Sequence, residues 1–130
     1  MSVRGLSMLE RYPRRDGMYQ IMPDAVAVHD RYQHRVVRLD ALGSEIWLRI
    51  DGVTRLRDIA LDIAGHSGQP LEAMLRKATA MTGILIGEGL AFLSLEPEPL
   101  PYHLTVPQED QDPAQAEASM RAAGWLPNSL

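Results

Sequence analysis

The sequence contains no cysteine, which excludes disulfides, thiolate zinc sites, iron–sulfur clusters and a cysteine nucleophile. Lysine is scarce, because Lys77 is the only one among the thirteen basic residues. No apolar run approaches the roughly 20 residues that a membrane helix needs, and the first residues lack the apolar core of a signal peptide. These absences together predict a soluble, cytoplasmic protein without a membrane partner.

An excess of positive charge is also absent, since the formal net charge of −4 gives no general argument for nucleic-acid binding. Residues 1–95 hold 12 basic and 11 acidic side chains, a net of +1, whereas residues 96–130 hold one basic and six acidic ones, a net of −5. We therefore expect three parts: a flexible N-terminal arm at 1–16, a folded domain at 17–95 and an acidic, Pro-rich C-terminal extension at 96–130.

The centre of the predicted core is a strand that turns into a helix within one residue. In Arg35–Leu39, Val37 and Leu39 share one face of an alternating strand. Asp40 then suits a helix N-cap, because its carboxylate can accept an amide N–H of the first turn. Gly52 is typical of a helix stop. Between these two residues the apolar side chains recur at helical spacing: Leu42, Ile46, Trp47 and Ile50.

Two more strands are predicted before this corner, at residues 18–22 and 25–29, with a hairpin loop at 30–34. A short apolar segment at 90–95 suits a last strand. The strand patterns alternate in hydrophobicity, which is typical of an antiparallel sheet with one buried face.

Two apolar stripes at helical spacing follow the corner. The first covers residues 56–64, with Thr54 as its N-cap, and the second covers 71–85, with Pro70 in the first helical position. A turn at 65–68 separates them. The fold class is therefore α+β, with a three-stranded antiparallel sheet followed by three helices in a winged helix-turn-helix-like layout.

Residues 36–52, together with Thr54 and Ile59, resemble the PqqD family of RiPP recognition elements. The family pattern is a strand ending in Leu-Asn/Asp, then a small residue, Gly, an apolar-Trp/Leu pair, Asp-Gly and a threonine-led helix. The positions that match are Leu39, Asp40, Gly43, Ile46, Trp47, Asp51, Gly52, Thr54 and Ile59. The resemblance covers about residues 17–95.

The resemblance implies a non-catalytic protein that captures the leader of a ribosomally made precursor peptide. It also implies a modifying enzyme as partner, such as a radical SAM enzyme or a cyclase. The leader would add a strand to residues 35–39 and lie beside the third helix, and an unpaired strand edge is inherently adhesive. The expected contact residues are Arg35, Val36, Val37, Arg38, Leu39, Leu75, Arg76, Ala78, Thr79 and Thr82. Arginines and Lys77 around this groove can pair with acidic groups of the peptide.

Chemistry-bearing residues give little support for an enzyme. His29 and His34 face each other across the predicted hairpin without an acidic third ligand, so we expect no metal site. The glycines in residues 83–89 lack the lysine of a phosphate-binding loop. No Ser-His-Asp set or carboxylate pair stands out. The sequence therefore predicts no catalysis and no cofactor.

Two other functions stay open. A winged helix-turn-helix is also a DNA-binding layout, but the third helix offers only Arg76 and Lys77, and Glu72 can pair with Arg76 at i, i+4. Nucleic acid is therefore the weaker hypothesis. The other possibility is a structural accessory subunit of an enzyme complex. A homodimer is compatible with all of these functions.

The extension has few signals of its own. Asp112 with Pro113 predicts the start of a short helix that Gly124 would end, and residues 102–106 are expected to be extended. The proline, glutamate and glutamine content favours disorder. The alternative is that this segment folds back into the groove, or into that of a neighbouring copy, anchored by Trp125, and imitates a leader.

Overall fold

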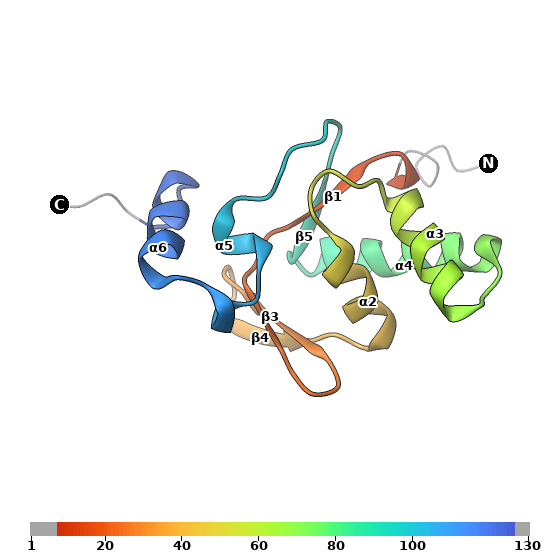
Figure 1. Ribbon diagram of the computed structural model, residues 1–130, viewed down its shortest axis with the longest axis horizontal. Helices are drawn as coiled ribbons and strands as arrows, with labels where there is room; N and C mark the ends of the chain where they lie inside the picture. The colour runs from red at the N-terminus through yellow and green to blue at the C-terminus, as the bar shows by residue number, and fades with distance from the viewer. Residues whose placement is uncertain (1–7, 127–130) are drawn as a thin grey trace.

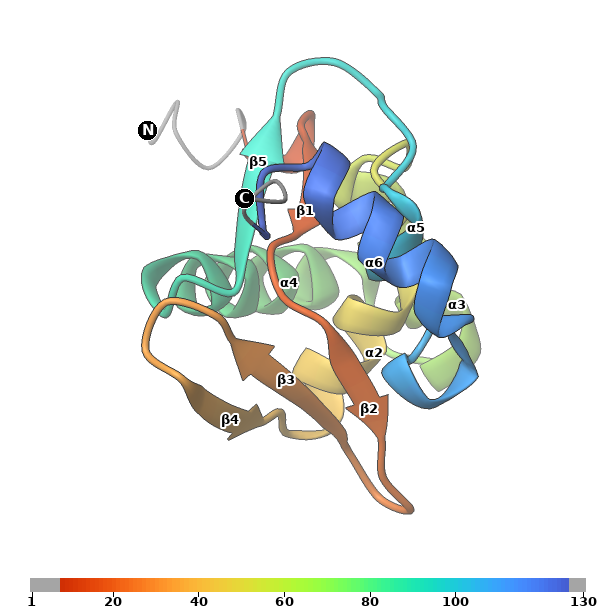
Figure 2. The ribbon, with the colours of Figure 1, turned by 90° about the vertical axis from the view of Figure 1, so that its left-hand side faces the viewer.

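The computed structural model describes residues 8–126 and packs two small antiparallel sheets against helices (Figures 1 and 2). One sheet has the strand order β2-β3-β4, and the other pairs β1 with β5. The strands are β1 Tyr12–Arg15, β2 Tyr19–Ile21, β3 Val26–Asp30, β4 Arg35–Arg38 and β5 Ala91–Ser94. The three strands β2, β3 and β4 followed by three helices confirm the predicted α+β, winged helix-turn-helix-like class.

The helices occupy the predicted segments and continue into the C-terminal part. They are α2 Ala41–Arg49, α3 Leu56–Ser67, α4 Leu71–Gly87, α5 Tyr102–Thr105, the 3-10 turn η1 Gln108–Asp110 and α6 Pro113–Ala122. In Figure 1, α3 lies at one end of the molecule and α6 at the opposite end.

Three helix boundaries differ from the sequence-based expectation. The helix that Gly52 was expected to stop already ends at Arg49, with the extended Ile50 as its C-cap. The N-cap of α3 is Arg55 rather than Thr54, whose hydroxyl donates to the Asp51 carboxylate (2.9 Å). The turn predicted at 65–68 is mostly helix, because α3 continues to Ser67 and ends only at Gly68, whose φ of 71° is left-handed.

The core forms where α2 crosses behind the three-stranded sheet and against α3 and α4. Trp47 and Ile46 are fully buried in it, and the Tyr19 ring meets the edge of Trp47 with centroids 6.0 Å apart. Leu39 is buried and Val37 packs against the same cluster, so the predicted inward face of β4 is confirmed. Each fully buried aliphatic side chain contributes roughly 1.5–3 kcal/mol.

The prediction of a flexible N-terminal arm at 1–16 is wrong for residues 12–15. Residues 12–15 form β1, which pairs with β5 so that Tyr12 faces Ser94 and Arg15 faces Ala91. The sequence-based prediction treated these residues as loosely held, because their hydrogen-bonding partner is distant in sequence and leaves no local periodicity. Residues 1–7 of the predicted arm lie outside the described residues.

The C-terminal extension is ordered and packed, which corrects the expectation of disorder for its described part. Leu100, Leu104 and Ala116 are buried. The helix predicted from Asp112 is confirmed, since Asp112 caps α6 by accepting from Gln115 N (2.9 Å). Of residues 102–106, expected to be extended, Tyr102–Thr105 instead form the short helix α5, and only Val106 is extended.

Candidate functional site

The outer edge of β4 is the feature around which the candidate site is built. β4 is the last strand of the sheet, and within residues 8–126 no strand pairs with its second side. Figure 2 shows β4 at the margin of the sheet, with β3 on its other side. Such an edge can accept the backbone of a further strand.

Alternation of the ladder decides which backbone groups of β4 face outward. Leu39 N donates to Val26 O on β3 (2.9 Å), and the register places Val37 in the equivalent position two residues earlier. In an antiparallel pair the bonded positions recur at every second residue. The N–H and C=O groups of Val36 and Arg38 therefore point away from β3, toward an incoming strand.

The side chains of β4 divide into an apolar and a charged group. Val36 is 58% exposed on the face opposite the core. Arg35 is held within the fold by Asp30 (2.9 Å) and Glu88 (2.6 Å), and these bonds raise its pKa, with Glu88 the larger cause. Arg38 pairs with Asp24 across an exposed surface. The structure thus gives the Arg35 charge two internal partners, whereas Arg38 stays accessible.

Helix α4 supplies the second side of the site. Leu75 and Thr79 are half-buried, and the Thr79 hydroxyl donates back to Leu75 O (2.8 Å). Ala78 and Thr82 are both 0% exposed, so they lie beneath the surface, where they support α4 from the core instead of lining a groove. Sequence periodicity could not separate these two layers, because all four residues share one broad helix stripe.

β4, α2 and α4 each contribute half-buried apolar residues at the margin of the core. Val37, Leu42, Leu75 and Met81 all pack against the core cluster while keeping part of their surface exposed. Met81 Sγ lies 3.4 Å from where a Cβ on Gly43 would stand, so α2 and α4 are in close contact here. This apolar band was only partly predicted, since Leu42 and Met81 were assigned to the core.

The two basic side chains of α4 differ in whether they have a partner within the fold. Lys77 donates to Gln69 Oε1 (3.0 Å). Arg76 is exposed, and among residues 8–126 it has no carboxylate within 4.0 Å, so the expected pair with Glu72 is not formed there. Arg76 is therefore a cation available to a partner.

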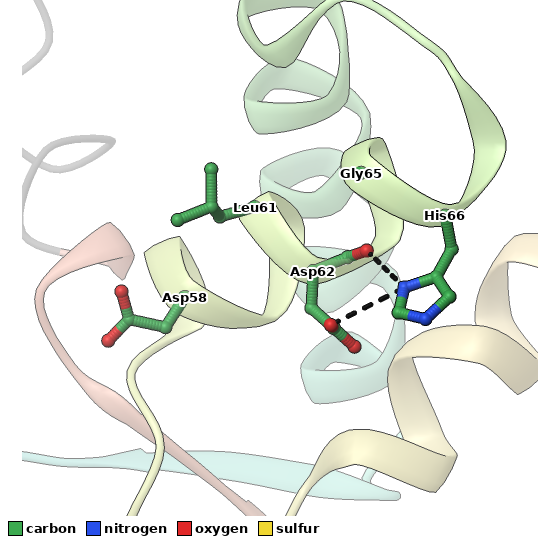
Figure 3. Close-up of a pocket in the computed structure, with 5 residues that line it drawn as sticks. All are labelled: Asp58, Leu61, Asp62, Gly65 and His66. Atoms are coloured by element: carbon green, nitrogen blue, oxygen red, sulfur yellow. Dashed lines mark hydrogen bonds and ion pairs between the residues drawn. The ribbon is translucent and has the colours of Figure 1, made fainter.

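Two hollows lie on the helical part of the domain. One, of about 350 Å³, is lined by residues of α2, α3 and α4 and by Gln69 between the last two helices. Its apolar residues are Ala41, Leu42, Ile63 and Met74. The other, of about 450 Å³, is drawn in Figure 3 and is lined by α3 alone, from Asp58 to His66. Its His66 ring contacts the Asp62 carbonyl (2.9 Å) and carboxylate (3.4 Å) of the preceding turn.

Neither hollow has the chemistry of a metal centre. In the described part of the chain, no three His, Asp or Glu side chains are grouped so that they could hold a metal ion. The acidic residues in Figure 3 come from successive turns on the exposed face of one helix. They are solvated, and their geometry offers no general acid or base directed at a shared point.

A buried arginine that the sequence did not single out joins the domain to its extension. Arg15 is 3% exposed and donates to Trp47 O through Nε (3.1 Å) and Nη2 (2.7 Å). Its Nη1 donates to Leu104 O (2.8 Å) and Thr105 O (3.0 Å). Burial lowers the pKa of Arg15, which has carbonyl oxygens as its close partners. This residue fixes where the extension docks.

The extension therefore reaches the β2 edge of the sheet and, with Trp125, the loop between β3 and β4. Its η1 turn contacts β2, and Trp125 lies over the Arg31 guanidinium, 4.0 Å from the ring centroid. The hypothesis that residues 97–126 occupy the groove beside β4 is contradicted by this placement. The hollow left at this junction, about 310 Å³, is lined largely by the side chains that dock the extension, Arg15, Arg31 and Trp125 among them.

Comparison with known proteins gives one match. The model of the family described as coenzyme PQQ synthesis protein D (PqqD) matches residues 12–91, from the first residue of β1 to the first residue of β5. No curated protein and no solved structure matches the chain. Within residues 8–126 no helix is long and apolar enough to cross a membrane.

Proposed function

This chain belongs to the PqqD family, and on that premise we propose that it is a peptide-binding accessory protein of ribosomal peptide modification. It captures the leader of a precursor peptide by strand addition and presents the precursor to a modifying enzyme, such as a radical SAM enzyme or a cyclase. The family match lies over the part of the chain that contains β4 and α4.

The observation that carries this proposal is the outward-facing backbone of Val36 and Arg38. A peptide strand beside β4 can satisfy these groups while its alternate side chains point toward α4. The half-buried band of Val37, Leu42 and Leu75 offers those side chains apolar contact. Backbone bonds then supply affinity, and the band supplies selectivity.

Charge favours a leader with acidic residues. Arg76 and Arg38 are exposed, and Lys77 lies next to Arg76 on α4. Arg35 contributes less than expected from the sequence, because Asp30 and Glu88 already neutralise it. Exposed pairs of this kind mainly accelerate association and weaken with salt.

The two other functions gain no support from a specific contact. A helix that reads DNA needs several basic or polar side chains toward bases and phosphates. The exposed face of α4 has Arg76 and Lys77 beside Glu72, and Gln69 already binds Lys77. A purely structural subunit would leave the open β4 edge without a role.

Removing one outward N–H tests the proposal. Proline is tolerated on strand edges whose N–H faces solvent, so Val36→Pro should keep the fold while deleting one bond to the peptide and placing a ring in its path. The matched control Val36→Thr keeps the N–H and the β-branched shape. We expect Val36→Pro to weaken binding of the precursor encoded beside the gene by about tenfold or more, in calorimetric titration.

The control should bind within about twofold of the unmodified chain, and thermal melting should be similar for both variants. Equal affinity of the two folded variants would contradict strand addition at β4. Absence of binding to that precursor by the unmodified chain would contradict the function itself.

A further inference from the structure

The three-stranded sheet has a second edge strand, β2. Like β4, it has backbone groups that point away from β3. His29 N donates to Met18 O (2.8 Å), so the backbone groups that face β3 are those of Met18 and, two residues later, Gln20. By the same alternation, the backbone groups of Tyr19 and Ile21 point away from β3. Strand addition alone would therefore not distinguish the two edges.

The C-terminal extension covers this edge at Ile21. The Glu109 carboxylate accepts from the outward Ile21 N–H (3.0 Å). Thr105 O lies 3.4 Å from the Tyr19 hydroxyl. Figure 2 shows the loop between α5 and α6 running beside β2, on the side away from β3. A strand approaching β2 would have to displace this loop and compete with a charged acceptor, which forms a stronger hydrogen bond than a neutral carbonyl.

The loop is held in place by its own network. The Gln111 amide donates to His103 O (2.8 Å) and Val106 O (3.1 Å), so it bridges the two ends of the loop. At the base of the loop, Arg15 binds the last carbonyls of α5. The loop that covers β2 is therefore held by specific hydrogen bonds, and it lies beyond the residues matched by the family model.

We propose that residues 105–110 act as an edge guard that determines which sheet edge is available for strand addition. The guard excludes extended segments from β2 and leaves β4 as the edge of this sheet that a peptide can use. Its consequence for peptide selectivity rests on the proposed function, whereas the closure of β2 against other copies of this chain does not.

The most direct consequence of the edge guard concerns association between copies of this chain. A sheet with two open edges can join head to tail without closing, which produces growing chains of copies. A sheet with one open edge can form at most a closed pair. Removing the guard should therefore convert a species limited to monomer or dimer into a concentration-dependent series.

The test replaces Pro107, Gln108, Glu109 and Asp110 by glycine and serine, which keeps α5, α6 and the Arg15 contacts. Glu109→Ala removes only the carboxylate, and Asp110→Ala is the matched control, because it removes the same charge from the neighbouring position. Amide exchange at Ile21 and sedimentation velocity over a range of concentrations are the two measurements.

We expect exchange at Ile21 to rise at least about tenfold in Glu109→Ala and in the loop replacement, but not in Asp110→Ala. The loop replacement should form species larger than dimers, and adding Val36→Pro should stop this growth by closing β4. Unchanged exchange at Ile21, or faster exchange without assembly, would overturn the proposal. Peptide titration reports the proposed function separately, since its failure would leave the assembly result unaffected.

Discussion

At the scale of single residues, Arg15 shows how a buried cation is accommodated without a carboxylate beside it. A lone buried charge is costly, and here carbonyl oxygens from two chain segments satisfy the guanidinium. Trp47 O lies in the last turn of α2, where the helix carbonyls carry partial negative charge, and it also accepts from Ile50 N (3.2 Å). Lysine could not replace this arginine well, because only the planar fork reaches both segments at once.

His103 is a second buried polar residue at the same junction. Its ring is 0% exposed, Nδ1 lies 2.7 Å from Ser119 Oγ, and Nε2 has no partner in the described part of the chain. Burial, followed by the charge of Arg31, lowers the pKa of His103. The ring therefore resists protonation while the extension is docked.

We expect acidification to destabilise the fold through His103. The pKa is lowered in the folded state, so above the unfolded value of about 6.5 both states are neutral and no stability is lost. As the pH falls below 6.5 the unfolded chain gains the proton first, and stability decreases. Urea unfolding at pH 8 and pH 5.5 should show a smaller loss in His103→Phe than in the unmodified chain; an equal loss would refute this assignment.

At the scale of elements, the corner between β4 and α2 depends on one local contact. Asp40 Oδ1 accepts from Gly43 N (2.7 Å) and caps α2 while the chain leaves β4. Gly43 is buried, and a side chain there would press on Asp40 and Met81. The corner thereby fixes the angle between the open edge and the helices behind it.

Loss of this cap should weaken the corner measurably. Asp40→Ala removes the acceptor of an otherwise unpaired helix N–H and should lower the free energy of unfolding by about 1 kcal/mol. Asp40→Asn retains an acceptor and should cost only a few tenths of a kcal/mol. Denaturant unfolding of the two variants provides the comparison, and equal losses would show that the carboxylate does not act as a cap.

At the scale of the whole molecule, the extension stabilises the domain that it covers. Leu100, His103, Leu104 and Ala116 are all buried, although they lie beyond the family match. The chain also crosses back over the domain at Gly52, whose carbonyl accepts from Glu98 N (2.9 Å). Gly52 has a φ of 84° and a Cβ there would lie 2.2 Å from Glu98 O, so only glycine fits this crossing.

A chain ending at residue 99 should therefore be less stable by a few kcal/mol, which corresponds to a melting temperature about 10 °C lower. Arg15→Met should cost about 2–4 kcal/mol in the full chain, because buried carbonyls lose their donor, and clearly less in the shortened chain. Thermal and denaturant unfolding of the four proteins measure this coupling. Additive effects would show that Arg15 does not act through the extension.

Much of the fold followed from local sequence pattern. The strand at 35–38, the Asp40 cap and the stripes of α3 and α4 depend on contacts within a few residues, which period and capping rules describe. The same is true of α6, which begins after Asp112 as predicted. The candidate site was predicted as far as the identity of its strand and helix.

Tertiary structure decided what local pattern does not encode. β1 is a strand only because β5 pairs with it, and Arg15 is buried only because Trp47 and Leu104 converge on it from distant parts of the chain. Likewise, Ala78 and Thr82 share a helix stripe with Leu75 and Thr79, and only tertiary packing separates the fully buried members from the half-buried ones.

The sequence by itself therefore determined a strand joined to a helix, because adjacent residues suffice for both. Which edge of the sheet stays open depended on the docking of a segment almost 90 residues away from the strand it covers, as the separation of 88 between Ile21 and Glu109 shows. Contacts of this kind arise from side-chain geometry in the folded state, and no periodicity in the sequence records them.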